Sequence, residues 1–264
     1  MLLYGYGGDG GLGFSAFLPF VLYGNGELFL TRSLRVKGEW KIYVLTKQLE
    51  RKEICVLLNT IDQMGFFDYD PATYEANKVP FDGSSGTHAW RSKEVALYGL
   101  DSLIQHLKVD PHFCDGCPPL PTILPALWNT HDLLSQYPEY AEGLEIYQPK
   151  RLVVDIDEIE STSEGGQWPL ASPTLAELVS EGHTIILEGE AARSIYELFG
   201  QQIHNSMVWH EGGKSYRVST LPLLPYQELP GSDYYIQPLL GAPPPPSTLS
   251  CSPEDGLLEL PATP

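Results

Sequence analysis

The fold expected for this chain is decided by Phe20-Val21-Leu22-Tyr23-Gly24-Asn25-Gly26-Glu27-Leu28-Phe29-Leu30-Thr31. Two apolar and aromatic arms flank the central Gly24-Asn25-Gly26. Asn-Gly is the strongest short signal for a β-hairpin, because a type I′ turn needs positive φ at both of its central residues. We therefore predict a β-hairpin here and take antiparallel strands as the base of the fold.

Composition indicates a folded protein with an acidic surface. The chain has 264 residues, 42% of them hydrophobic, and a net charge of −18, so it can bury a substantial core and would repel a phosphate backbone. Nucleic acid is therefore not an expected partner. Seven of the sixteen basic residues lie between positions 30 and 52. We interpret this basic cluster as a solvated strand and helix face in preference to a local anion-binding patch.

A strand at Trp40–Val44 and a helix from Thr46 to Met64 are expected after the hairpin. Apolar residues recur along the second segment at the three- and four-residue spacing of one buried helix face, and Gly65 follows as a stop. Cys55 lies beside this apolar stripe, where we interpret it as a packed thiol.

The remaining elements are predicted from periodicity and turn residues. Residues 1–19 read as a glycine-rich loop, because the Gly5–Gly10 match to G-x-G-x-x-G has no helix after it. Strands are expected at 94–98, 151–156 and 184–187, helices at 100–107, 126–136, 175–179 and 191–199, and a second hairpin from 207–209 and 215–219. This pattern predicts one α+β domain over residues 1–228, with antiparallel hairpins and packed helices. Residues 229–264 lack Lys and Arg and contain four consecutive prolines, so they read as an acidic, Pro-rich, extended or disordered tail.

Cys114 and Cys117 form the most specific candidate site, in a Cys-x-x-Cys arrangement with His112 two residues before it. We favour a local disulfide or a pair of structural thiols. Zinc bound by His112, Cys114 and Cys117, with His106 or a distant group as a fourth ligand, is the second interpretation, since zinc prefers four N or S ligands. Thiol–disulfide exchange is the third, and the two prolines that follow remove the helix N-terminus that would activate the thiol.

A second candidate is the acidic run from Asp155 to Glu160. On a strand, Asp155 and Asp157 would share one face and Ile156 would take the other. The spacing of a calcium loop is missing, so a solvated face is favoured over calcium binding.

Several turn and packing motifs occur in an order that resembles a group of uncharacterised bacterial envelope proteins, often predicted to be lipoproteins. They are Leu22-Tyr23-Gly24-Asn25-Gly26, Met64-Gly65-Phe66-Phe67, Val95-Ala96-Leu97-Tyr98-Gly99-Leu100, Trp168-Pro169-Leu170, Gly213-Lys214-Ser215-Tyr216-Arg217-Val218 and Leu221-Pro222-Leu223-Leu224-Pro225. The resemblance covers residues 20–226 and implies a fold and an extracytoplasmic or cell-envelope location. It carries no established activity.

The sequence thus favours a non-enzymatic extracytoplasmic binding or accessory protein that contacts another envelope protein, with no cofactor and no catalytic residues assigned. The alternative is a hydrolase or metal-dependent enzyme with a site assembled around His112, Cys114 and Cys117. The sequence contains no run of 18 or more apolar residues, so no transmembrane helix is predicted and peripheral association with the envelope is expected. The first residues lack the features of a signal peptide, which leaves a cytoplasmic location as the alternative.

Overall fold

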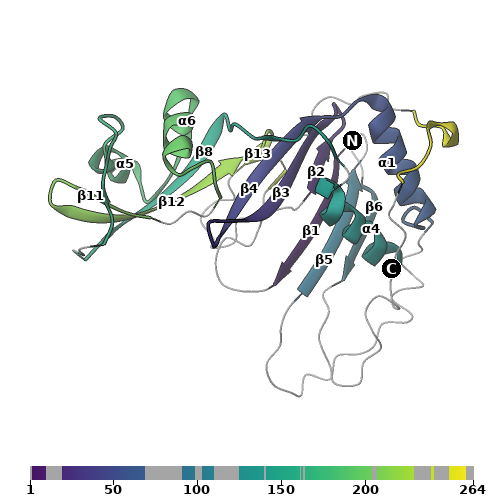
Figure 1. The fold of residues 1–264 in the computed structure, drawn as a ribbon, viewed down its shortest axis with the longest axis horizontal. Coiled ribbons are helices and arrows are strands. Elements are labelled where there is room, and N and C mark those ends of the chain that lie inside the picture. Colours follow the sequence, from purple (N-terminus) through teal and green to yellow (C-terminus); the bar gives the residue numbers. More distant parts are fainter. Residues whose placement is uncertain are drawn as a thin grey trace, which may run out of the picture.

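Two β-sheets lie side by side along the long axis of the protein, and each carries helices on one face (Figure 1). The structure, a computed structural model, describes residues 2–9, 20–68, 91–98, 103–109, 125–139, 141–160, 162, 164–203, 207–228, 239–240 and 250–259. Among the strands that the structure describes, pairing is antiparallel except between β9 (Gly166–Gln167) and β11 (Met207–Glu211). The α+β architecture predicted from the sequence is therefore confirmed.

The first sheet has seven strands in the order β6-β5-β1-β2-β3-β4-β7. Their bounds are β1 Leu2–Asp9, β2 Phe20–Tyr23, β3 Glu27–Val36, β4 Glu39–Gln48, β5 Arg91–Tyr98, β6 Leu103–Val109 and β7 Glu145–Ile146. Helices α1 (Arg51–Gln63) and α4 (Pro125–Gln136) cover one face of it. The core under these helices takes Leu28 and Leu30 from β3, and Leu57 and Ile61 from α1, all fully buried.

The second sheet has five strands in the order β10-β8-β12-β11-β9. Its remaining strands are β8 Arg151–Ile159, β10 Thr184–Glu188 and β12 Lys214–Leu223, and helices α5 (Leu175–Glu181) and α6 (Gly189–Leu198) pack on one face. Successive side chains of a strand point to opposite faces of the sheet. Leu152, Val154 and Ile156 of β8 therefore share one face, and all three join the core beneath the helices. The short elements η1 (Tyr137–Glu139), β13 (Gln227–Glu228), β14 (Leu239–Leu240) and η2 (Pro253–Asp255) complete the described secondary structure.

A third apolar cluster joins the two sheets. Val21, Tyr23 and Phe29, on the face of the first sheet away from α1, pack with Val153 and other residues of the second sheet. The Tyr23 hydroxyl donates to the Pro225 carbonyl at 2.5 Å. Burial, with smaller contributions from neighbouring tyrosines and a glutamate, raises the pKa of Tyr23 above its ordinary range, so the phenol stays a neutral donor.

The hairpin predicted from the opening stretch is confirmed as β2 and β3, but its turn differs from the expected one. Leu22 pairs with Leu28, and three residues form the loop, with Gly26 N–H donating to the Tyr23 carbonyl at 2.9 Å. Only Gly26 has positive φ (89°), so this is a three-residue loop and not a type I′ turn at Asn25-Gly26. A Cβ on Gly26 would lie 2.5 Å from the Leu49 carbonyl oxygen, which explains the glycine.

Three sequence predictions are wrong in this region of the fold. Residues 2–9 form a strand and not a loop, because their backbone pairs with β2 on one side and β5 on the other. Residues 103–109 form strand β6 and not a helix, since a short apolar run fits either period and pairing with β5 decides the outcome. The helix predicted from Thr46 begins only at Arg51, because β4 continues to Gln48 along β3.

The other predicted elements are confirmed. They are the helices at 126–136, 175–179 and 191–199, the strands at 40–44, 94–98, 151–156 and 184–187, and the second hairpin, now β11 and β12. The amphipathic spacing and Gly-based turns that predicted them agree with their tertiary surroundings.

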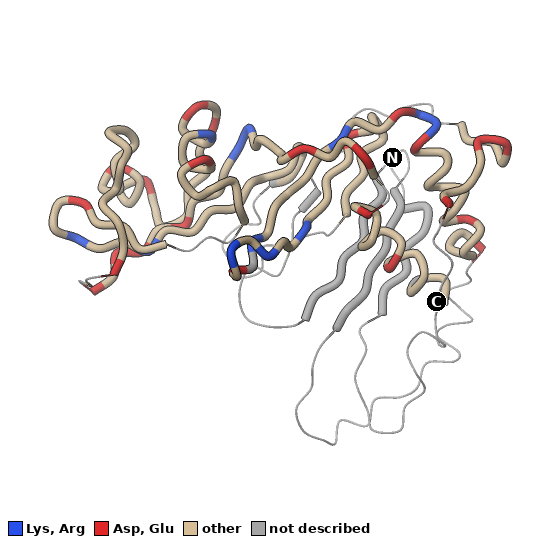
Figure 2. Tube along the Cα trace, viewed as in Figure 1, with Lys and Arg blue, Asp and Glu red and all other residues tan. Residues whose placement is uncertain are grey.

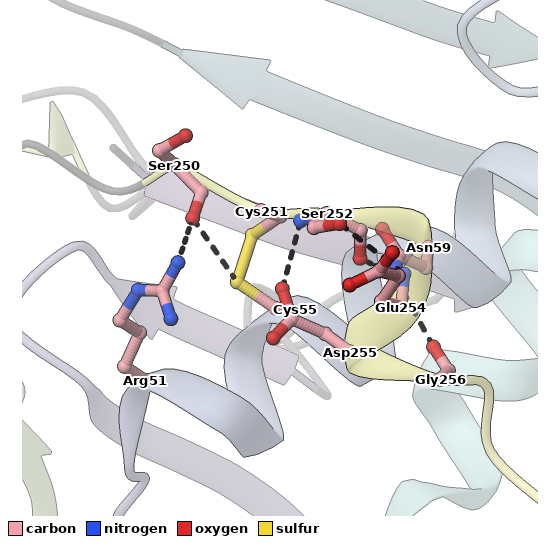
Figure 3. Close-up of a disulfide and its surroundings, with 9 residues drawn as sticks. All are labelled: Arg51, Cys55, Asn59, Ser250, Cys251, Ser252, Glu254, Asp255 and Gly256. Carbon is pink, nitrogen blue, oxygen red and sulfur yellow. Dashed lines mark hydrogen bonds between the residues drawn. A yellow bond between two sulfur atoms is a disulfide. The ribbon is translucent and has the colours of Figure 1, made fainter.

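Residues 250–259 pack along α1 and are fixed there by a disulfide (Figure 3). Cys55 on α1 is bonded to Cys251, so the interpretation of Cys55 as a free packed thiol is wrong. The Asn59 amide donates to the carbonyls of Ser252 at 2.8 Å and Gly256 at 3.2 Å. We call residues 250–259 the C-terminal strap; it lies within the segment expected to form an extended or disordered tail.

The strap also contributes to the core. Leu258 packs against the cluster beneath α1, and its backbone N–H donates to the Thr60 hydroxyl at 2.9 Å. Arg51, at the start of α1, donates to the Ser250 carbonyl. Contacts to one helix face from a segment about 195 residues away in sequence could not be read from local periodicity.

Candidate interaction surface

We call residues 32–41, the outer part of the β3–β4 hairpin, the distal ribbon (Figure 1). Leu28 and Leu30, at its base, are fully buried, whereas every residue from Arg32 to Arg35 is exposed. The apolar side chain of Leu34 is among them, with 37% of the residue's surface exposed, which is high for a leucine on a strand. The strand pairing continues unchanged from the buried base into this exposed part.

A tight two-residue turn closes the ribbon. Val36 pairs with Glu39, and the two residues between them have positive φ, 51° at Lys37 and 89° at Gly38. Positive φ at both positions defines a type I′ turn, whose twist matches that of the flanking strands. The Arg35 Nε donates to the Gly38 carbonyl at 3.3 Å across this turn. The ribbon is therefore a regular hairpin to its tip.

The ribbon is a cluster of basic residues on an otherwise acidic protein (Figure 2). It carries Arg32, Arg35, Lys37 and Lys41 against a single acidic residue, Glu39, for a net charge of +3. The rest of the chain has 12 basic and 33 acidic residues, a net of −21. Within the described parts of the chain, none of the four cations forms a salt bridge. Their charge is therefore available to an outside partner.

The two faces of the ribbon differ in what they present. Cross-strand neighbours share a face, so Arg32, Leu34 and Lys41 lie on the side that α1 covers nearer the base. Arg35 lies on the opposite side, because successive strand residues alternate. Positive charge is thus available on both faces, with Leu34 as an apolar contact between the cations of one face.

The ribbon also has one open backbone edge. Leu49 N–H donates to the Gly26 carbonyl at 2.8 Å, which fixes the alternation: even-numbered residues of β3 hydrogen-bond to β4, and odd-numbered residues point their N–H and C=O groups away. Pairing with β2 ends at Leu30. On this edge, no described strand pairs with Ser33 or Arg35, so their outward backbone groups face away from β4 without a described strand beside them.

The opposite edge of the hairpin, on β4, is largely covered. The N–H of Ile203 donates to the Ile42 carbonyl at 2.8 Å, and that of Tyr147 donates to the Val44 carbonyl at 2.9 Å. Strand β7 pairs with Leu45 and Thr46. The two edges of the hairpin therefore differ among the described residues: the β4 edge is covered from Ile42 onward, whereas Ser33 and Arg35 on β3 have no strand beside them.

The base of the hairpin is tied to α1 by charge. Lys47 on β4 donates to a Glu53 carboxylate oxygen at 2.6 Å, and the other oxygen accepts from the Glu50 N–H at 2.8 Å in a capping box. Partial burial raises the pKa of Glu53, but the hydrogen bonds and the Lys47 charge outweigh it and leave the pKa below its usual value. The base of the hairpin is therefore anchored to the start of α1.

The predicted site at His112, Cys114 and Cys117 lies outside the described residues. His106, the suggested fourth ligand, lies on β6 opposite Ala96. The described parts of the chain contain no cluster of three or more His, Cys, Asp or Glu residues that could hold a metal ion.

The acidic run on β8 is arranged as the sequence suggested. Ile156 is buried, Asp157 and Glu158 are exposed, and Glu158 accepts from the Lys214 ammonium at 2.8 Å. Asp155 accepts from the Thr184 hydroxyl at 2.8 Å. Ordinary cross-strand partners thus occupy these carboxylates, in keeping with the expected solvated face.

Sequence reasoning recognised the basic cluster but not the open edge beside it. The signal was available in part, since Lys37-Gly38 between two alternating segments resembles a hairpin tip. The disulfide was missed because four cysteines allow three pairings and sequence does not choose among them.

Comparison with known proteins identifies no relative: the chain matches no protein-family model, no curated protein and no solved structure. Among the helices that the structure describes, none combines the length and the apolar character needed to cross a membrane.

Proposed function

We propose that this protein is a non-enzymatic binding or accessory protein outside the cytoplasm, which contacts another envelope protein through the distal ribbon. The observation that carries the proposal is the ribbon itself: an exposed hairpin of net charge +3, without internal salt bridges in the described residues, on a chain that is otherwise −21. An exposed leucine between cations gives such a surface apolar contact as well as charge.

The disulfide supports the extracytoplasmic part of the proposal. Disulfides form and persist in oxidising compartments and are rare where glutathione and thioredoxin keep thiols reduced. Cys55 is fully buried and Cys251 partly buried, so the bond is shielded from reductant. The resemblance of the turn and packing motifs to envelope proteins implies the same setting.

The test of binding is photo-crosslinking in cells of the source organism. A photoreactive phenylalanine at Leu34, on the ribbon, is expected to crosslink one partner protein, whereas the same residue at Leu257, an exposed position on the strap, is not. Changing Arg32, Arg35, Lys37 and Lys41 together to Gln should remove the crosslink. Equal crosslinking at both positions, or a crosslink unaffected by the charge change, would contradict the proposal.

The test of location is the mass of the native protein after alkylation without reductant. Cys55 and Cys251 are expected to remain unalkylated and to be found in one disulfide-linked peptide pair after proteolysis. Alkylation of both thiols in freshly isolated protein would contradict an oxidising location.

A further inference from the structure

We propose that the partner adds a strand to the open edge of β3, and that this strand is an extended, acidic segment of another protein. The inference rests on the proposed function, because it names the mode of contact and the chemistry of the partner at the same ribbon. Strand addition supplies affinity through backbone hydrogen bonds and specificity through side chains on alternate positions.

The backbone of the ribbon supports this mode of binding. Ser33 and Arg35 point their N–H and C=O groups away from β4, by the alternation that the Leu49–Gly26 hydrogen bond fixes. The β4 edge has partners at Ile42 and Val44. Among the described residues, Ser33 and Arg35 on the β3 side are therefore the positions where an incoming strand would pair.

The charges select an acidic strand. Arg32 and Arg35 are three residues apart and lie on opposite faces of β3. A neighbouring strand with two acidic residues that are also three positions apart could place one of them beside each arginine. Exposed, unpaired cations on an edge oppose pairing with a like-charged strand, so they permit an acidic partner and exclude a basic one.

The same charges argue against a second copy of this chain at this edge. Pairing two β3 edges would place Arg32 and Arg35 of one copy beside those of the other, and like charges directly opposite destabilise a sheet. Binding to an anionic membrane is also disfavoured. It would bring the rest of the protein, with its net charge of −21, close to a surface of the same sign, and like charges repel.

The first experiment uses hydrogen exchange on the full chain with a defined probe. The probe is the capped peptide Val-Thr-Glu-Val-Thr-Glu-Val-Thr, and its control has Gln in place of both Glu residues. At a concentration of about 100 times its Kd, the acidic peptide should slow exchange at the Ser33 and Arg35 amides about 100-fold. The amides of Arg32 and Leu34, already bonded to β4, should exchange slowly with or without peptide.

The second experiment removes one outward donor. Ser33→Pro deletes the N–H that faces the open edge, where proline is tolerated, and Ser33→Ala keeps it. We expect Ser33→Pro to weaken binding of the acidic peptide about three- to tenfold relative to Ser33→Ala. Equal thermal midpoints of the two variants establish that the ribbon is intact; if Ser33→Pro unfolds, hydrogen exchange on the unaltered chain decides.

The outcomes separate the inference from the function on which it rests. A native partner crosslinked at Leu34 that binds Ser33→Pro and Ser33→Ala equally, and leaves the Ser33 and Arg35 amides unprotected, overturns strand addition while the binding function stands. A native crosslink that survives loss of all four cations overturns both. Sedimentation with phosphatidylglycerol vesicles that depends on the four cations, without protection by the peptide, overturns strand addition in favour of lipid.

Discussion

Helix α1 and the distal ribbon belong to one continuous run of chain, residues 27–63, yet they are treated in opposite ways by the rest of the protein. The C-terminal strap covers α1 and is bonded to it through Cys55 and Cys251 (Figure 3). The ribbon has an uncovered β3 edge at Ser33 and Arg35 in the described residues. The strap makes α1 part of the core. The open β3 edge leaves the ribbon available for binding.

Loss of the disulfide tests the covered side of this comparison and should have the largest effect. Replacing Cys55 and Cys251 together with Ala opens a constraint across 196 residues, and we expect a loss of about 2–5 kcal/mol in the free energy of unfolding. Chemical denaturation measures it. Exchange rates of the Ser33 and Arg35 amides should stay unchanged, and a parallel change there would contradict the independence of strap and ribbon.

Truncation of two leucines on β3 contrasts the base of the hairpin with the ribbon. Leu30→Ala removes a fully buried side chain beneath α1 and should cost about 3 kcal/mol in the free energy of unfolding. Leu34→Ala, at 37% exposure, should cost less than about 0.5 kcal/mol. Urea unfolding of both variants measures the difference. Comparable losses would show that Leu34 is covered in solution.

Two glycines with the same φ of 89° offer a finer contrast. Gly26→Ala combines unfavourable backbone conformation with a Cβ 2.5 Å from the Leu49 carbonyl oxygen, so it should cost about 2–4 kcal/mol in the free energy of unfolding. Gly38→Ala meets nothing within 4 Å and should cost only the backbone term, about 1–2 kcal/mol. Thermal unfolding ranks them, and the reverse order would contradict the described hairpin geometry.

The smallest effect is the pH dependence that Glu53 contributes at the start of α1. Its folded pKa is depressed, so its contribution to stability is complete above the unfolded pKa and is lost as pH falls through the folded value. Glu53→Gln should therefore lower stability slightly at pH 7 and leave it unchanged at an acidic pH where Glu53 is protonated in both the folded and the unfolded state. Unfolding at both pH values measures this, and Asp62→Asn near the end of α1 serves as control. A larger deficit at low pH would contradict the assigned sign.

Much of the fold followed from local pattern. Leu28 and Leu30 alternate with residues of the other face, and Leu57 and Ile61 follow helical spacing, so strand and helix were both recognisable. Residues 2–9 and 103–109 were misassigned, because their strand conformation comes from pairing with β5 and not from their own sequence. The start of α1 was placed too early at Thr46 for the same reason, since β3 holds β4 in extended form through Gln48.

Only one of the two features of the candidate site, its basic charge, could be predicted from the sequence. The basic cluster between positions 30 and 52 is a matter of composition, but it was interpreted as a solvated face of a strand and helix. Whether Ser33 and Arg35 present free backbone groups depends on where β2 ends and what lies beside β4. Neither is a property of the ribbon's own residues. The predicted site at His112, Cys114 and Cys117 lies outside the described residues and stays a prediction.

The sequence by itself determined the α+β class, the hairpin at Gly24-Asn25-Gly26 and the unequal distribution of charge, because turn chemistry, hydrophobic periodicity and composition act over a few neighbouring residues. Only the tertiary structure decided which cysteines pair, that the strap covers α1, and that one edge of the ribbon is open. These features join or separate segments up to about 200 residues apart. Local sequence carries no record of such neighbours, since burial and pairing are properties of the assembled chain.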